Sequence, residues 1–152
     1  MQLDVHNQYL NSRIMTAAPQ KLHLMLIEGA VHQARLAKKL WDVADCVAER
    51  DEAIMRCIDI TGEMLLGVRD SDQAIARQVT DVYAFLLRTV TEAKLLNDVT
   101  KLDDALRILE IERGTWQKVC EKFGDTRMND YPIPENDQYV AAVERSAPSA
   151  IA

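Results

Sequence analysis

The chain has 152 residues, a formal net charge of −6 and an isoelectric point near 5.0. This acidic balance opposes binding to nucleic acid, because phosphate contacts need lysine and arginine gathered on one face. Apolar residues make up 48% of the chain but aromatic residues only 5%, and abundant alanine, leucine, methionine, glutamate, lysine and arginine favour helix over strand. We therefore expect a single all-α domain.

The composition also bears on cellular location. The 3 cysteines, Cys46, Cys57 and Cys120, are odd in number and scattered within helical patterns, so we interpret them as small buried apolar groups in a reducing compartment. The first residues, MQLDVHNQYLNSR, lack the apolar core of a secretion signal. No segment approaches the ~18 uninterrupted apolar residues that span a membrane. We expect a cytoplasmic protein without membrane insertion.

Residues 1–18 are expected to form an extended lead-in, because Pro19 disfavours helix before it and suits a first helical turn. A first helix is predicted from Pro19 to about Val47, ended or re-phased by the charged run 49–52. One side of it carries Leu22, Leu26, Ala30, Ala34, Ala37, Leu40, Trp41 and Ala44. Near its start, large apolar residues surround more of the helix than a single core contact needs: Leu22, Leu24, Met25, Leu26 and Ile27. The helix either lies deep or has a second binding face.

Three further segments repeat apolar residues at intervals of three and four, which predicts three more helices. The second carries its apolar residues over 54–68. The third is predicted to start at the capping box 70–73 and to stop at 97–98. The fourth is predicted to start at the weaker capping pair Thr100 and Asp103, to place Trp116 in the core and to end at Phe123, with Gly124 as its C-cap.

Short connections between helices of this length favour antiparallel neighbours. The fold class predicted for residues 19–124 is therefore an all-α, up-down-up-down four-helix bundle. Three of the 4 prolines, Pro132, Pro134 and Pro148, follow Gly124. Since residues 125–152 are also polar and poor in core-forming side chains, we expect a mostly flexible C-terminal tail.

Catalytic and metal-binding patterns are not found in the sequence. A di-metal site in a helical bundle needs Glu-x-x-His on two helices, and the chain has no such motif. His23 and His32 are nine residues apart, which places them on opposite sides of one helix. Phosphate-loop glycines, nucleophile elbows and Cys-x-x-Cys pairs are also absent. We expect no metal, no cofactor and no enzymatic activity. A generic helical scaffold and a histidine phosphotransfer domain using His32 remain as alternatives.

In the stretch YLNSRIMTAAPQKLHLMLIEGA, a helix start rich in apolar residues follows three features: Tyr9, an aliphatic residue five positions later, and the pattern Thr-Ala-x-Pro. The third helix reads DVYAFLLRTVTEAKLLND, and Arg113 and Trp116 occur near the end of the fourth. Together these motifs resemble the flagellar secretion chaperone FliS family over about 9–123. Gln20, where a glycine is usual, and Ile27, where a tyrosine is usual, depart from the family pattern.

This resemblance implies an export chaperone that binds the C-terminal segment of flagellin in the cytoplasm and prevents its premature polymerisation. Other flagellar export or regulatory proteins are left open as partners. Expected partner-binding residues are Tyr9, Ile14, Thr16, Ala17, Pro19, Leu22, Met25, Leu26 and Tyr83. The lead-in, with its apolar Tyr9 and Ile14, is either displaced by flagellin or holds the first helix permanently. Of Tyr83 and Phe85, which flank Ala84, only one is expected to be fully buried.

Overall fold

The computed structural model describes residues 19–69 and 74–124. The lead-in 1–18, the predicted capping box 70–73 and the tail 125–152 therefore lie outside the described residues. Within the described ranges the chain forms α2 (Pro19–Lys39), α3 (Val47–Arg69), α4 (Ala74–Leu95) and α5 (Val99–Phe123), with a short 3₁₀ helix, η1 (Ala44–Cys46), before α3. The predicted all-α fold with four long helices is confirmed.

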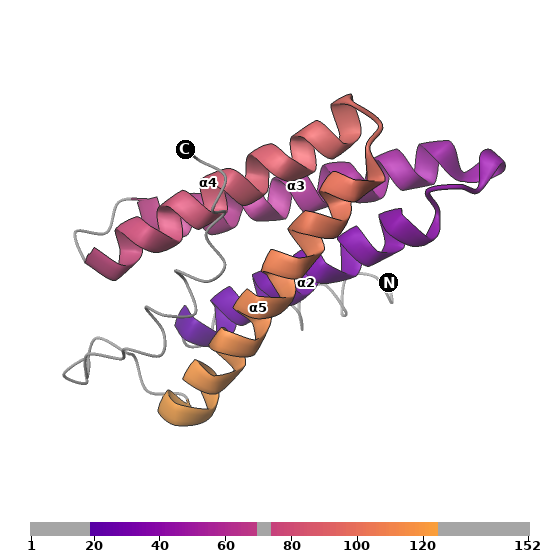
Figure 1. Ribbon diagram of the computed structural model, residues 1–152. Coiled ribbons are helices and arrows are strands. Elements are labelled where there is room, and N and C mark those ends of the chain that lie inside the picture. Colours follow the sequence, from indigo (N-terminus) through magenta and orange to yellow (C-terminus); the bar gives the residue numbers. More distant parts are fainter. Residues whose placement is uncertain (1–18, 70–73, 125–152) are drawn as a thin grey trace, which may run out of the picture.

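The helices form a ring of neighbours, in which α2 and α4 each pack against both α3 and α5. The chain reverses direction at each connection, and α5 lies tilted across α2 (Figure 1). This is the predicted up-down-up-down four-helix bundle. It brings the start of α2 and the end of α5 to one end, and the α2–α3 and α4–α5 connections to the other.

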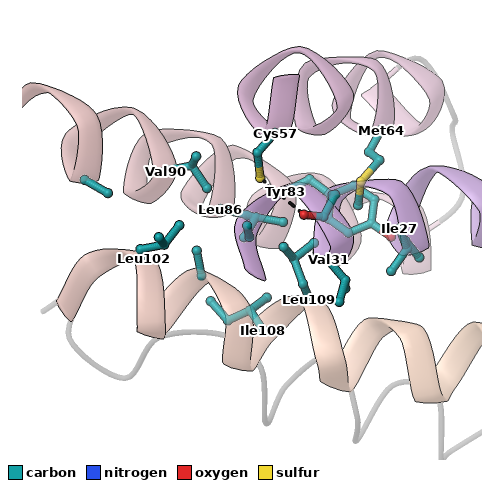
Figure 2. Close-up of a cluster of buried hydrophobic side chains, with 14 of the residues drawn as sticks. Ile27, Val31, Cys57, Met64, Tyr83, Leu86, Val90, Leu102, Ile108 and Leu109 are labelled. Carbon is teal, nitrogen blue, oxygen red and sulfur yellow. Dashed lines mark hydrogen bonds between the residues drawn. The ribbon is translucent and has the colours of Figure 1, made fainter. Parts of the chain in front are cut away.

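The core forms where the apolar stripes of the four helices meet, and small and large side chains come from different helices. α2 contributes Ala30, Ala34 and Ala37, which are completely buried. Because these side chains are small, the neighbouring helices can pack closely on α2. The largest buried side chains come mainly from the other helices: Ile54, Met64, Tyr83, Leu86, Leu102 and Leu109. Figure 2 shows Tyr83 pointing into the middle of the bundle, among side chains from the other three helices.

One of the 3 cysteines belongs to this core. Cys57 is completely buried, and its thiol donates a hydrogen bond to the carbonyl of Ala30 at 3.6 Å. Burial raises the pKa of Cys57 to about 12, so the thiol stays protonated and unreactive at neutral pH. The interpretation of Cys57 as a small buried apolar group is confirmed. Cys46 and Cys120 are only half-buried.

The predicted end of the first helix is wrong. α2 ends at Lys39 rather than near Val47, and the charged run 49–52 lies inside α3 rather than at a break. The chain turns at 40–43, where the guanidinium of Arg50 lies 4.7 Å from the centre of the Trp41 ring and Arg50 Nη1 is 3.5 Å from the Trp41 carbonyl oxygen. This turn contains no glycine or proline, and Arg50 of α3 contacts Trp41 across it. Ala44, expected on the inner side of the first helix, is consequently exposed.

The predicted cap of the fourth helix is also wrong, by two residues. Asp98, not Thr100, is the N-cap of α5, and its carboxylate accepts from the Thr100 backbone N–H at 2.9 Å. Asp98 can cap α5 because α4 ends in a tight turn in which Asn97 has a φ of 52° and the Asp98 N–H bonds to the Ala93 carbonyl at 3.0 Å. The predicted C-cap is confirmed, since the Gly124 N–H bonds to the Cys120 carbonyl at 2.8 Å.

Candidate partner-binding site

The first half of α2 carries the unusually wide apolar surface that the sequence indicated. Ile27 is completely buried. Four other large apolar side chains of this stretch are half-buried: Leu22, Leu24, Met25 and Leu26. Leu26 packs against the buried core, whereas Leu22 and Met25 are not part of that packing. Because residues two apart on a helix point about 200° from each other, Met25 and Ile27 face opposite ways. The start of α2 therefore has apolar groups on a second face.

Further along α2, helix α3 lies against it at Gly29. A Cβ atom at Gly29 would lie 3.4 Å from Cδ1 of Ile60 on α3, so the two helices come close together here. Pro19, the first residue of α2, is exposed. Four of the other predicted partner-binding residues, Tyr9, Ile14, Thr16 and Ala17, lie outside the described residues.

Tyr83, in contrast, lies inside the bundle. Its exposed fraction is 0%, while Phe85 is only partly buried, as expected for the two residues that flank Ala84. The Tyr83 hydroxyl donates to Oε2 of Glu112 on α5 at 3.0 Å and lies 2.6 Å from Nε2 of His23 on α2. Tyr83 thus joins α4 to α2 and α5 through polar contacts. Direct contact between Tyr83 and a partner stays a prediction, and such contact would require this packing to change.

His23 is enclosed by aromatic rings from two helices. Its ring centre lies 5.5 Å from that of Tyr83 and 4.2 Å from that of Trp116, which is half-buried against the core as expected. Desolvation by this burial lowers the pKa of His23 to about 4, so the imidazole is neutral at neutral pH. Because the Tyr83 hydroxyl gives its single hydrogen to Glu112, this geometry requires the neutral tautomer of His23 with hydrogen on Nε2.

Glu112 is the buried polar residue that sequence reasoning missed. Its exposed fraction is 0%. It lies three residues after Leu109 and four before Trp116, on the same stripe of α5, so helical spacing alone would have placed a carboxylate in the core. Such a carboxylate is costly to bury unless it is hydrogen-bonded. Its contact with Tyr83 supplies one of the bonds that make this position tolerable.

Two sets of polar contacts hold α2 against α5. At the start of α2, Nε2 of Gln20, a residue whose exposed fraction is 1%, donates to the Gly124 carbonyl at 2.9 Å. At the other end of α2, two ion pairs cross to α5: Arg35–Glu110 and Lys38–Asp103, the latter at 2.6 Å. These ion pairs are solvent-exposed and contribute only a few tenths of a kcal/mol each. Glutamine at position 20 therefore has a structural use, because it joins the two helices at the end where the lead-in begins.

Within residues 19–69 and 74–124, no group of three or more histidine, cysteine, aspartate or glutamate side chains is placed to hold a metal ion. In the same part of the chain, none of the helices combines the length and the apolar character that crossing a bilayer requires. His32, the residue considered for phosphotransfer, is exposed on α2.

The fold and this site define a small helical bundle with a partly exposed apolar helix face, held by a polar network in its interior. The family model described as "Flagellar protein FliS" matches residues 2–123, and the chain belongs to this family. It is 26% identical over 115 residues to the flagellar secretion chaperone FliS of Salmonella typhimurium, covering 74% of this chain and 84% of that protein. It is 24% identical over 116 residues to the protein of the same name from Vibrio cholerae, covering 75% and 84%. The family and these names support a flagellar secretion chaperone.

Proposed function

We propose that this protein binds the C-terminal segment of flagellin in the cytoplasm and keeps it from polymerising before export. The single observation that carries this proposal is the second apolar face at the start of α2, where Leu22 and Met25 are half-buried without belonging to the packed core. Membership of the FliS family and the names of the two relatives support flagellin as the partner. Other export or regulatory proteins of the flagellum are further partners to test.

The proposed mechanism is stoichiometric masking without catalysis. An amphipathic segment that is disordered when free exposes apolar groups that would otherwise associate with one another. A bundle with an accessible apolar helix face can cover such groups by packing a partner helix against that face. Ordering the segment costs about 2–5 kcal/mol of the gross interaction energy, so the contact must be extensive rather than confined to one pocket.

The lead-in is proposed as the regulatory part of this surface. It joins α2 at Pro19, directly beside Leu22 and Met25, and it carries the apolar residues Tyr9 and Ile14. A segment attached at this point can compete with flagellin for the apolar face of α2. In the competing hypothesis it packs there permanently and only stabilises the start of the helix.

The proposal is tested by titration calorimetry of the full chain with the C-terminal segment of flagellin from the same organism. We expect one-to-one binding with a negative heat-capacity change of about 0.25 kcal/mol/K, if roughly 1,500 Å² of mostly apolar surface is buried. Absence of binding at high micromolar concentration by a protein shown to be folded would refute the proposal and favour a generic scaffold.

Two variants locate the surface. Met25→Ser should weaken flagellin binding by about tenfold, because it removes an apolar anchor from the proposed contact. Leu95→Ser is the matched control, since Leu95 is an exposed apolar residue at the end of α4, on the end of the bundle opposite to the start of α2 (Figure 1). Circular dichroism must show that both variants keep their helix content. An equal loss of affinity in both variants would contradict the location of the surface.

Removing the residues before Ser12 tests the role of the lead-in. If the lead-in competes with flagellin, its removal should raise the affinity, because the apolar face of α2 no longer has to be vacated. Unchanged affinity would refute displacement and leave the lead-in as a permanent part of the start of α2.

A further inference from the structure

Exposed apolar side chains gather at the end of the bundle opposite to the start of α2. Among the described residues, seven large apolar side chains are exposed, and five of them lie at or near the α2–α3 and α4–α5 connections. We call these five residues the distal apolar patch: Val43, Val47, Met55, Leu95 and Leu96. Leu95 and Leu96 are 74% and 63% exposed, more than any other large apolar side chain in the described ranges. Exposed apolar side chains gathered at one end of a molecule are typical of an interaction site.

Both connections lie at the same end of the molecule. Nζ of Lys94, in the last turn of α4, is 3.1 Å from Sδ of Met55 in the third turn of α3. From Met55 back to Val47, α3 continues for eight residues, or about 12 Å. Figure 1 shows the α2–α3 turn reaching beyond the end of α4. The start of α3 therefore extends past the end of α4. Val47 and Met55 are exposed on α3, and Leu95 and Leu96 are exposed at the end of α4.

The patch is held in a fixed geometry on both sides. In the α2–α3 turn, the Val43 N–H bonds to the Leu40 carbonyl at 3.2 Å, and the Cys46 N–H bonds to the Val43 carbonyl at 3.0 Å. In the α4–α5 turn, the Leu96 N–H bonds to the Glu92 carbonyl at 2.8 Å. Because the backbone is already ordered, a partner that covers these side chains does not have to order it on binding.

Acidic residues flank the patch on the α2–α3 side. Asp42, Asp45 and Glu49 are exposed, and none of the three has an ion pair within residues 19–69 and 74–124. The cations beside them are Lys39, which is exposed, Lys94, whose ammonium lies on the Met55 sulfur, and Arg50, which pairs with Asp51. The whole chain also carries a net charge of −6. Carboxylates that have no ion pair and lie next to apolar groups favour a partner that presents basic and apolar residues together.

We propose that the distal apolar patch docks an amphipathic helix of a second protein, with lysine or arginine residues beside its apolar stripe. The apolar stripe of the partner helix lies on Leu95, Leu96 and the start of α3. Its basic residues face the carboxylates of the α2–α3 turn. Since this patch and the start of α2 are at opposite ends of the bundle, the second protein and flagellin bind at the same time. The docking proposal does not depend on the proposed function. Only the simultaneous binding of flagellin rests on that function.

The probe is a synthetic helical peptide of about 18 residues, with leucine at positions i, i+3, i+4 and i+7 and lysine at the others. A second peptide has glutamate in place of every lysine. Binding to the isotope-labelled full chain is followed by amide chemical shifts and calorimetry. We expect the lysine peptide to shift the amides of the two connections and to bind at least about tenfold more tightly than the glutamate peptide. Shifts gathered elsewhere, or equal affinity for both peptides, would overturn the proposal.

Two matched variants distinguish binding at the patch from nonspecific apolar binding. Leu95→Ser should weaken binding of the lysine peptide by about tenfold, because Leu95 is the most exposed anchor. Leu66→Ser is the control and removes an equally large side chain that is 50% exposed. Leu66 lies on the same face of α3 as Met55, eleven residues or about 16 Å away from the patch. This change should leave the affinity unchanged. Both positions are exposed, so neither change removes core packing. Equal affinities of the two variants would contradict docking at the patch.

The flagellin segment then tests simultaneous binding. Leu95→Ser should bind flagellin as tightly as the unchanged protein, and saturation with the lysine peptide should not alter that affinity. A tenfold loss in either experiment would show that the patch belongs to the flagellin surface and would overturn an independent site. If the unchanged protein fails to bind flagellin while the lysine peptide still maps to the patch, the proposed function fails and the docking proposal stands.

Discussion

Removal of the Tyr83 hydroxyl should destabilise the bundle far more than the loss of one hydrogen bond. The hydroxyl lies 2.6 Å from Nε2 of His23 and 3.0 Å from Oε2 of Glu112, and neither contact is replaced in Tyr83→Phe. Two polar groups in the interior then each lose a partner, and each costs about 1–2 kcal/mol of desolvation that is no longer compensated. We expect the free energy of unfolding to fall by about 2–4 kcal/mol.

The measurement is urea unfolding at pH 7 followed by circular dichroism, together with a thermal scan. For a chain of this length about 3 °C accompanies each kcal/mol, so the Tm should fall by about 6–12 °C. Thr91→Val is the matched control in the same helix, because its hydroxyl only bonds back to the Leu87 carbonyl, at 2.7 Å. This control should change the free energy of unfolding by less than about 0.5 kcal/mol. If Tyr83→Phe is as mild as the control, the polar network does not hold the helices together.

Three further substitutions test His23, Gly29 and Gly124. The first should change the pH dependence of the free energy of unfolding, the second should raise this free energy and the third should lower it. The pKa of His23 is lowered to about 4 in the folded protein, so the unfolded chain binds a proton first as pH falls below 6.5; stability is lost between pH 6.5 and 4, by up to about 3 kcal/mol. Urea unfolding at pH 7, 6 and 5 should show a weaker loss for His23→Gln than for the unchanged protein, while the exposed control His32→Gln should behave as the unchanged protein does. A full loss in His23→Gln would refute this reasoning. Gly29→Ala should raise the free energy of unfolding by about 0.5–1 kcal/mol, since its Cβ meets Ile60 at an ordinary contact distance and alanine favours helix; a fall in stability would show that α2 and α3 cannot accept a methyl group there. Gly124→Ala should lower the stability by about 1 kcal/mol, because the φ of 57° is strained for alanine, and an unchanged Tm would contradict a strained C-cap.

The fold was predictable from the sequence because each helix repeats its apolar residues with helical spacing, and those stripes can be buried only against one another. Boundaries fixed by local chemistry were also predictable, as at Pro19 and at Gly124. The end of α2 was not. The turn that follows it has no glycine or proline to mark it in the sequence, and Arg50 packs over Trp41 there, a contact that local propensity does not encode.

The candidate site was predictable only in part. The wide apolar surface of α2 follows from residue type and spacing, and half-buried Leu22 and Met25 agree with it. Tyr83 was expected at the partner surface on the basis of the family motif, and the structure places it in the interior. Tyr83 lies four residues after Val79 and three before Leu86, both of which are buried, so helical spacing indicated the inner face that the family motif did not.

The sequence by itself determined that this chain is a four-helix bundle of the FliS type, because hydrophobic periodicity and the opening motif are local properties. Only the tertiary structure decided which polar groups meet. The contacts among His23, Tyr83 and Glu112 join three helices, and the residues lie 60 and 29 positions apart in the chain. The distal apolar patch is likewise a tertiary feature. Its residues come from two connections that lie next to each other only because alternate helices run in the same direction, so one end of the bundle collects both turns.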